Sequence, residues 1–316
     1  SYASFSKMAV AEKQRDDGID AVSIVTPNHM HFPVAKAFLE QGIAVISDKP
    51  LTVSLDEALE LEALVKQSGS FFAVTHNYTG YPLVRQARHM VKTGELGNIR
   101  LVHVEYLQDW LTNKEEEGGN KQAEWRTDPA RSGPAGSLGD IGTHAFNMAE
   151  YLTGQEVKSI LADLNTRYED NQLDVDGTIL IRFSEYVKGV IRSSQIATGE
   201  ENGLEVKIYG TKGGFNWKQE NPNYLYYLTD DKPVQVLKPG HAYNGEVSLD
   251  GTKLPPGHPE GIFDSMGNIY YGVAKAIRNQ AHDSGEYPTM NDGVRGMKFI
   301  EKCVESHKSG NVWLDI

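Results

Sequence analysis

The first 75 residues of this chain alternate between helical patterns and short apolar runs, and this alternation constrains the fold more than any other feature. The apolar runs predict buried strands at residues 21–25, 44–47 and 71–74. The patterns around them predict helices at residues 4–16, 33–41 and 54–69, with Gly42 and Gly69 as stop signals. Ser54, followed three residues later by Glu57, predicts a capping box. Strands alternating with helices of this length indicate βαβ units and a parallel sheet.

The pattern changes after a predicted helix at residues 83–92. Strand-like runs then follow closely at residues 99–108, 157–167, 178–183, 187–196, 204–209, 223–228 and 233–237. Such spacing predicts a large open sheet, antiparallel or mixed. Residues 239–262 hold four Pro and five Gly and predict a long loop, and helices are expected at 263–279 and 292–308. We therefore expect an α/β protein: a parallel-sheet domain at residues 1–77 and an α+β domain at residues 78–316.

Composition excludes several classes of function. With 316 residues the chain can form two domains, and its net charge is −12, from 31 basic and 43 acidic residues. Because no basic stripe offsets this charge, we expect no binding to nucleic acid or to membranes. Cys303 has no cysteine to pair with and is interpreted as a buried apolar residue. A cytoplasmic protein fits this usage.

Two motifs fall at predicted strand ends, where an open parallel sheet binds its ligands. Thr26-Pro27-Asn28 follows the first strand, and an ordinary Pro-Asn turn would explain it equally well. Asp48-Lys49-Pro50 follows the second strand. Lys49 could be a solvated lysine, but Pro50 fixes the backbone after it. A lysine held at such a place can donate a hydrogen bond to a substrate oxygen.

His29 and His31 could be read as a pair of metal ligands. A metal site needs a third and a fourth ligand, and the neighbouring sequence offers none. We therefore expect no metal.

Asp140 and His144 form the third candidate site. They lie four residues apart at the start of a predicted helix, a spacing that stacks two side chains on one face. A carboxylate beside an imidazole is a way to orient a general base near neutral pH, although a surface contact is the commoner use of such a pair. We expect Lys49, Asp140 and His144 to converge on one cleft between the sheet edge and the second domain.

The surroundings of this pair are rich in glycine and aromatic residues. Glycines recur every third residue from Gly133 to Gly142 without forming a G-x-G-x-x-G motif, and we interpret them as allowing close approach of backbone. Trp125-Arg126 precede them in what reads as a loop facing the same cleft. Such a pair can hold a polyol or a nucleotide, or can simply pack the loop.

In order and spacing, these motifs resemble the glucose–fructose oxidoreductase, inositol dehydrogenase and rhizopine-catabolism (Gfo/Idh/MocA) family. Thr26-Pro27-Asn28-x-x-His31 resembles its T-P-N-x-x-H segment, and Asp48-Lys49-Pro50 resembles its E-K-P motif with Asp in place of Glu. Gly139-Asp140-Ile141-Gly142-x-His144 resembles its D-x-G-x-H catalytic segment. The similarity runs through nearly the whole chain.

The resemblance implies a Rossmann domain that binds NAD or NADP and a second domain that binds a sugar or cyclitol. It implies hydride transfer from the substrate carbon to nicotinamide, with His144 as the base, Asp140 orienting and charging it, and Lys49 polarising the oxygen. The candidate cofactor-binding residues are Thr26, Pro27, Asn28, His31, Asp48, Lys49, Pro50, Asn77, Trp125 and Arg126. The candidate substrate-binding residues are Lys49, Tyr78, Gln108, Arg126, Asp140 and His144.

One departure from the family pattern is large. The strand, Gly-rich turn and helix that hold the pyrophosphate in the family have no counterpart, since the first glycine is Gly18. We expect that the sequence begins inside the Rossmann domain and is a fragment of a longer protein. A noncatalytic ligand-binding or regulatory relative is the alternative to an enzyme. We further expect one apolar face of the second sheet to pack against a second copy, giving a homodimer or homotetramer.

Overall fold

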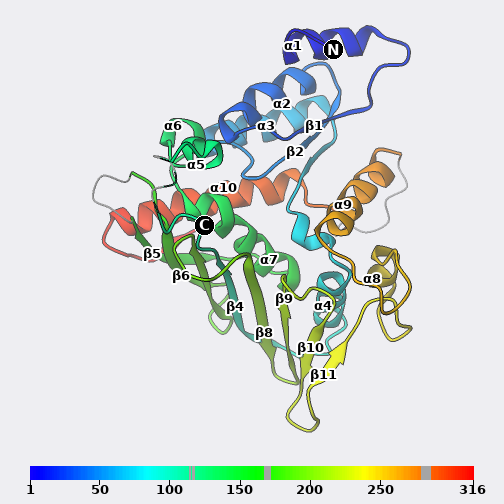
Figure 1. Ribbon diagram of the computed structural model, residues 1–316, viewed down its shortest axis with the longest axis vertical. Coiled ribbons are helices and arrows are strands. Elements are labelled where there is room, and N and C mark those ends of the chain that lie inside the picture. The colour runs from blue at the N-terminus through cyan, green and yellow to red at the C-terminus, as the bar shows by residue number, and fades with distance from the viewer. Residues whose placement is uncertain (114, 116–117, 167–171, 279–285) are drawn as a thin grey trace.

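The computed structural model describes the chain except for residues 114, 116–117, 167–171 and 279–285. It contains two sheets, a small one near the N-terminus and a large one that fills the other half of the molecule (Figure 1). The expected positions 167 and 279 lie outside the described residues.

The small sheet is parallel, as predicted. Within the described residues it has three strands in the order β1-β2-β3, and its βαβ units confirm the expected fold class. Its elements are α1 (Phe5–Gln14), β1 (Ala21–Ile24), η1 (Asn28–Met30), α2 (His31–Leu39), β2 (Ala44–Ser47), α3 (Leu55–Ser68) and β3 (Phe72–Val74).

Local sequence signals explain the ends of α3. The Ser54 hydroxyl accepts a hydrogen bond from the Glu57 amide at 3.3 Å, as a capping box requires. Glu57 returns its carboxylate to the amide of Val53, one residue before the cap, so the box is only half formed. Gly69 ends the helix with φ +66°, a left-handed conformation that glycine adopts without steric cost.

The large sheet is mixed. Its nine strands within the described residues have the order β11-β10-β9-β8-β4-β7-β6-β5-β12, and only β4 and β7 pair in parallel. This arrangement confirms the predicted open mixed sheet. The strands are β4 (Ile99–Leu107), β5 (Ser159–Asn165), β6 (Asp176–Arg182), β7 (Lys188–Ser194), β8 (Gly203–Gly210), β9 (Gly214–Lys218), β10 (Leu225–Leu228), β11 (Gln235–Leu237) and β12 (Leu314–Asp315).

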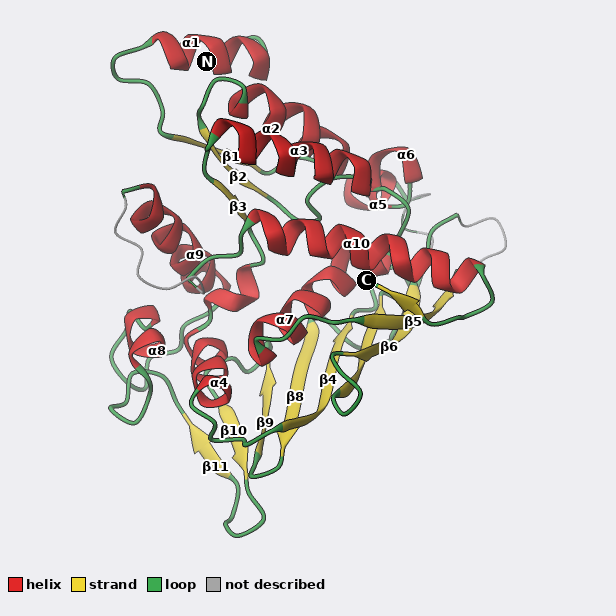
Figure 2. Cartoon of the chain, turned by 180° about the vertical axis from the view of Figure 1, so that it is seen from behind, coloured by secondary structure: helices red, strands yellow, loops and turns green. Residues whose placement is uncertain are grey.

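Helices cover one face of the large sheet and connect it to the small one (Figure 2). The helical segments of this half are η2 (Asn77–Gly80), α4 (Pro82–Lys92), α5 (Lys121–Arg126), α6 (Pro129–Ser132), η3 (Leu138–Gly142), α7 (Thr143–Thr153), α8 (Glu246–Gly251), α9 (Ile262–Ile277) and α10 (Met290–Lys308). Helix α10 packs on β5 and α7 and also on α3 and β3. The rings of Phe146 and Phe299 stack at 4.4 Å in its interface with α7. Because α10 belongs to both halves, the boundary at residue 77 stays a prediction.

The other face of the large sheet is more polar than expected. Leu161, Leu180 and Val190 lie side by side across β5, β6 and β7 and form an apolar row. In the next row, Arg192 lies beside Glu105 on the neighbouring strand. Charged residues therefore alternate with apolar ones along these strands, and the apolar part of this face is a row of side chains. The expected packing of this face against a second copy stays a prediction.

Two segments expected to be loops contain helices. Trp125 and Arg126 end α5, which Asn120 caps by accepting hydrogen bonds from the amides of Gln122 and Ala123. Helix α8 lies in the predicted loop 239–262, and Gln86 of α4 accepts a hydrogen bond from the Gly245 amide before it. Tertiary packing fixes this short helix. No helix in the described ranges is long and apolar enough to cross a membrane.

Candidate active site

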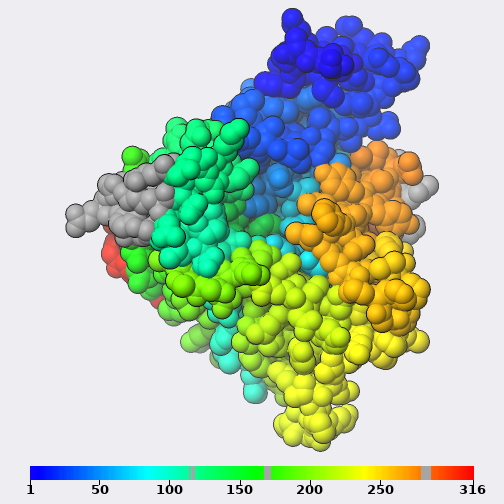
Figure 3. All heavy atoms as spheres, in the orientation of Figure 1, coloured from blue at the N-terminus to red at the C-terminus, as the bar shows by residue number. Residues whose placement is uncertain are grey.

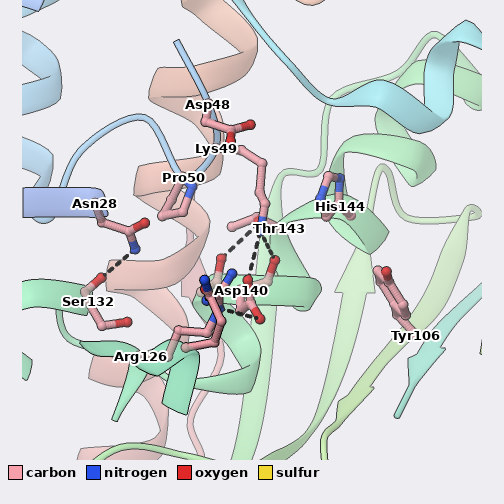
Figure 4. Close-up of polar contacts among 12 residues, drawn as sticks. Asn28, Asp48, Lys49, Pro50, Tyr106, Arg126, Ser132, Asp140, Thr143 and His144 are labelled. Atoms are coloured by element: carbon pink, nitrogen blue, oxygen red, sulfur yellow. Dashed lines mark hydrogen bonds and ion pairs between the residues drawn. The ribbon is translucent and has the colours of Figure 1, made fainter. Parts of the chain in front are cut away.

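Lys49 and Asp140 meet between the two sheets (Figure 4). Lys49 follows β2, and its peptide bond to Pro50 is cis. Its ammonium group donates to the backbone oxygen of Asp140 at 2.5 Å and to Oδ1 of the same residue at 2.9 Å. Both side chains are largely buried, so the ion pair is poorly screened by water. The structure thus brings together the predicted strand-end lysine and the predicted carboxylate.

The second oxygen of the Asp140 carboxylate is also occupied. Oδ2 accepts a hydrogen bond from the Gln195 amide at 2.9 Å and forms an ion pair with Nε of Arg126 at 3.3 Å. Burial alone would raise the pKa of Asp140, but the positive charges of Lys49 and Arg126 outweigh it and hold that pKa below its usual value. Asp140 is therefore a carboxylate at neutral pH. Sequence reasoning missed Gln195, which lies directly after β7.

Asp174 fixes the backbone that carries Asp140. Its buried carboxylate accepts hydrogen bonds from the amides of Gly136 and Leu138 and from the Ser137 hydroxyl, all at 2.7–2.8 Å. A Cβ on Gly136 would lie 2.1 Å from the Asp174 carbonyl oxygen, so only glycine fits there. The interpretation that glycines in this segment allow close backbone approach is confirmed at this position.

Asp140 does not contact His144 in the way that their spacing predicts. Residues 138–142 form a π-helical turn, in which the Thr143 amide bonds to the oxygen of Leu138, five residues earlier. This wider turn removes the i, i+4 stacking of an α-helix. Among the described residues, no hydrogen bond joins the Asp140 carboxylate to the His144 ring, whose partner is His76 instead. The expected role of Asp140 in orienting this imidazole therefore stays a prediction.

His144 lies instead among aromatic side chains. Its Nδ1 is 3.5 Å from Nδ1 of His76, and its ring meets that of Tyr78 edge-on at 4.8 Å. Burial, with smaller contributions from the Lys49 and His76 charges, holds the pKa of His144 well below 6.5. Its imidazole is therefore neutral at neutral pH and able to accept a proton. Sequence reasoning also missed His76, although it follows β3 as Lys49 follows β2.

The predicted substrate-binding residues Tyr78 and Gln108 belong to one hydrogen-bonded chain. The hydroxyls of Tyr78 and Tyr106 are 2.5 Å apart, and Tyr106 donates to Oδ1 of Asn202 at 2.6 Å. The same oxygen accepts from the Gln108 amide at 3.1 Å. Burial raises the pKa of both tyrosines, so they remain protonated.

His31 connects the two predicted strand-end motifs. Its ring is buried, with Nδ1 2.8 Å from the oxygen of Pro50 and Nε2 2.9 Å from the oxygen of Thr26. Both nitrogens are thus engaged by backbone, and His31 can act on a cofactor only by shaping these turns. Asp48 accepts a hydrogen bond from the Thr75 hydroxyl, which joins the ends of β2 and β3.

The remaining cofactor candidates lie on either side of these turns. Asn28 donates to the Ser132 oxygen at 2.9 Å and so ties the first turn to α6. Asn77 is buried, and its backbone oxygen accepts from Ser265. Trp125 stacks against the Arg126 guanidinium at 4.2 Å, and Arg126 reaches Asp140.

The residues at the sheet edge fit a dinucleotide. Val25, directly after β1, is 72% exposed, and Thr26 is exposed next to it. Figure 3 shows blue and cyan atoms of this half at the surface between the green α5–α6 region and the orange α9 region. Lys49, which follows the neighbouring strand β2 at the same sheet edge, gives this edge a positive charge that suits a negatively charged ligand.

A parallel sheet with a held lysine and a neutral histidine near its carboxyl edge is compatible with a nucleotide-dependent oxidoreductase, and the comparisons with known proteins decide the class. The sequence matches the family model "Oxidoreductase family, NAD-binding Rossmann fold" over residues 1–76 and the "GFO/IDH/MocA C-terminal domain" over residues 84–216. The chain belongs to the GFO/IDH/MocA family of oxidoreductases, which confirms the resemblance and the predicted NAD-type cofactor.

Three relatives illustrate the similarity. A crystal structure of an oxidoreductase from Sinorhizobium meliloti is 43% identical, with a TM-score of 0.89, and the match covers 99% of this chain and 84% of that one. A crystal structure of an inositol dehydrogenase homolog from Azotobacter vinelandii, complexed with NAD⁺, is 32% identical with a TM-score of 0.93. The match covers 100% of this chain and 83% of that one. Levoglucosan dehydrogenase of Pseudarthrobacter phenanthrenivorans is 28% identical, and the match covers 95% of this chain and 81% of that protein. The family and these relatives confirm the prediction of an oxidoreductase over that of a noncatalytic relative.

Proposed function

We propose that this protein oxidises a ring hydroxyl of a sugar or cyclitol with NAD or NADP. The observation that carries the proposal is the pairing of Lys49, fixed by Asp140, with a buried neutral histidine on the adjoining helix. The substrate class is supported by relatives whose names refer to inositol and to levoglucosan.

Lys49 is suited to hold the reacting oxygen. An ammonium group has three donors, and Asp140 takes two of them within the described structure. The third can point at the substrate hydroxyl and stabilise the negative charge that develops on its oxygen. The carboxylate of Asp140 keeps the ammonium in place and offsets its charge.

His144 is suited to accept the hydroxyl proton. Its neutral ring nitrogen can take this proton as the carbonyl forms at the same carbon. A nicotinamide held at the sheet edge would supply the acceptor for the hydride that leaves that carbon. Tyr78 and Gln108 extend the polar surface available to other hydroxyls, and Arg126 can contribute through its contact with Asp140.

The surface and the composition support a proposal for the assembly and the location of the protein. The row formed by Leu161, Leu180 and Val190, flanked by charged side chains, supports packing of this sheet face in a homodimer or homotetramer. The acidic composition and the buried Cys303 fit the cytoplasm.

A reduction screen tests the proposal. The full-length protein is mixed with NAD⁺ or NADP⁺ and a panel of sugars and inositols, and absorbance of the reduced cofactor is followed. We expect turnover with at least one polyol and loss of that turnover in His144→Ala. Absence of reduction across the panel with both cofactors would contradict the proposal.

A further inference from the structure

A second histidine, His76, lies against the candidate base His144. The Asp140 carboxylate is taken up by Lys49, Gln195 and Arg126. The His144 ring meets His76 instead, with the two Nδ1 atoms 3.5 Å apart and the rings nearly perpendicular at 85°. This contact joins the end of β3 to α7 across the site.

The backbone holds His76 firmly. Its amide donates to the oxygen of Val74 at 3.1 Å, and its own oxygen accepts from the amide and the hydroxyl of Thr79. The amide of Thr75, just before it, bonds to the Ser47 oxygen at the end of β2. The His76 side chain is 2% exposed, so its ring has little freedom to turn away. A ring held in one position can orient the imidazole ring beside it.

Two neutral imidazoles that face each other through Nδ1 can share only one proton between those atoms. If both Nδ1 atoms carried a proton, or neither did, the contact would be repulsive. If His76 donates, His144 has its proton on Nε2 and cannot accept another there. If His144 donates, its Nε2 keeps a lone pair and can take a proton from a hydroxyl. Only the second arrangement leaves Nε2 of His144 as a base.

We propose that His76 is a positioning residue, which accepts the Nδ1 proton of His144 and so holds that imidazole in the tautomer with an unprotonated Nε2. The inference rests on the proposed role of His144 as the base. A neutral imidazole here orients without adding charge, unlike a carboxylate partner. Burial, followed by the Lys49 charge, lowers the pKa of His76 to about 3, so it stays neutral and cannot repel a proton on its partner.

Nitrogen-15 NMR of the histidine-labelled, full-length protein tests the tautomer directly. The two neutral tautomers give different ¹⁵N shifts at Nδ1 and Nε2, and the His144 signals are identified by their loss in His144→Ala. We expect the wild-type His144 proton on Nδ1. A proton on Nε2 overturns the inference whether or not the enzyme turns over a polyol, so this result is independent of the proposed function.

Variants of His76 provide the kinetic test. His76→Leu removes the acceptor and should lower kcat roughly 10- to 100-fold with little change in KM, the usual effect of losing an orienting partner. His76→Asn places an amide oxygen near the former Nδ1 position and should retain most of kcat. His258→Asn, at an exposed position outside the proposed site and the proposed interface, is the matched control and should leave kcat unchanged. Wild-type kcat in His76→Leu, or equal losses in the Leu and Asn variants, would overturn the inference.

Discussion

The Asp140 carboxylate lies 2.9 Å from the ammonium group of Lys49, a residue 91 positions earlier. It does not bond to the ring of His144, only four positions later, within the described structure. The Asp140-x-x-x-His144 motif suggests that Asp140 binds His144, but in the structure Asp140 binds Lys49 and leaves His144 to other neighbours. In the mechanism proposed above, Asp140 would control Lys49, the group that holds the substrate oxygen, while His144, the proposed base, contacts His76 and Tyr78.

The first prediction concerns that ion pair. Asp140→Asn keeps the shape of the side chain but leaves Lys49 and Arg126 without their shared counter-charge. We expect lower kcat and a loss of about 1–3 kcal/mol in the free energy of unfolding, because partly buried cations lose a charged acceptor. Denaturant titration and steady-state kinetics measure the two effects.

Gln195→Leu provides the matched control, because it removes one neutral hydrogen bond to the same carboxylate. This substitution should lower kcat and the free energy of unfolding less than Asp140→Asn does. A larger loss in Gln195→Leu than in Asp140→Asn would argue against the importance of the ion pair.

The second prediction concerns Lys49. Lys49→Met keeps most of the side-chain length and removes the donor to the substrate oxygen. We expect kcat to fall roughly 10²- to 10³-fold, comparable to the loss of one donor that stabilises a developing oxyanion. Cofactor affinity, measured by fluorescence titration of NADH, should change much less. Unchanged kcat in Lys49→Met would mean that the lysine serves only the ion pair.

Much of this site could be predicted because the sequence shows where the strands of the parallel sheet end. The apolar runs before Thr26 and Asp48 place both motifs at the carboxyl edge of a parallel sheet, and this is where they lie. The π turn before His144 could not be predicted, because residues 138–142 carry no local signal for it and the Asp174 carboxylate that binds the Leu138 amide belongs to another segment. Its consequence, the separation of Asp140 from His144, was missed with it.

His76 and Gln195 were missed for a related reason. Both follow strands, but neither stands in a motif whose chemistry is evident from its neighbours. Only the pairing of β2 with β3 brings His76 toward Lys49, and only the long sheet brings Gln195 to Asp140. Similarly, α8 is set by contact with α4, which local composition cannot reveal.

The third prediction concerns stability and pH. The pKa of His76 is lowered to about 3 in the folded protein, so between pH 6.5 and 3 the unfolded state binds more protons than the folded state. The stabilising contribution is therefore complete above pH 6.5 and is lost as the pH falls. For this residue alone we expect a loss of about 2 kcal/mol between pH 7 and pH 5.

Urea titrations at the two pH values check this, with His76→Asn as the comparison. The variant lacks the titrating group and should show a smaller pH dependence. An equal pH dependence in both proteins would show that other groups carry the acid sensitivity.

The fourth prediction concerns assembly. Leu180 is exposed at the centre of the apolar row on the open sheet face. If that face is covered by a second copy, Leu180→Glu should place an unpaired charge in the interface and shift the protein toward monomer. Light scattering at micromolar concentration measures this, with Tyr186→Glu, an exposed residue between β6 and β7, as the control. A wild-type protein that is already monomeric would contradict the proposed assembly.

The last prediction concerns His144 itself. His144→Ala removes the base and should lower kcat roughly 10²- to 10⁴-fold, the usual contribution of a positioned general base. Because burial holds the pKa of His144 well below 6.5, the wild-type enzyme should lose activity only as the pH falls below that value. Activity is lost only at acidic pH because the lowered pKa keeps the His144 imidazole neutral, and therefore able to accept a proton, across the neutral range. In His144→Ala the remaining activity should not decline in this way at acidic pH.

Steady-state kinetics from pH 4.5 to 8.5 measure the pH profiles of the wild type and the variant, with the affinity for NADH expected to be nearly unchanged. Wild-type turnover in His144→Ala would identify His144 as a structural histidine that packs against Tyr78 and would require a different base.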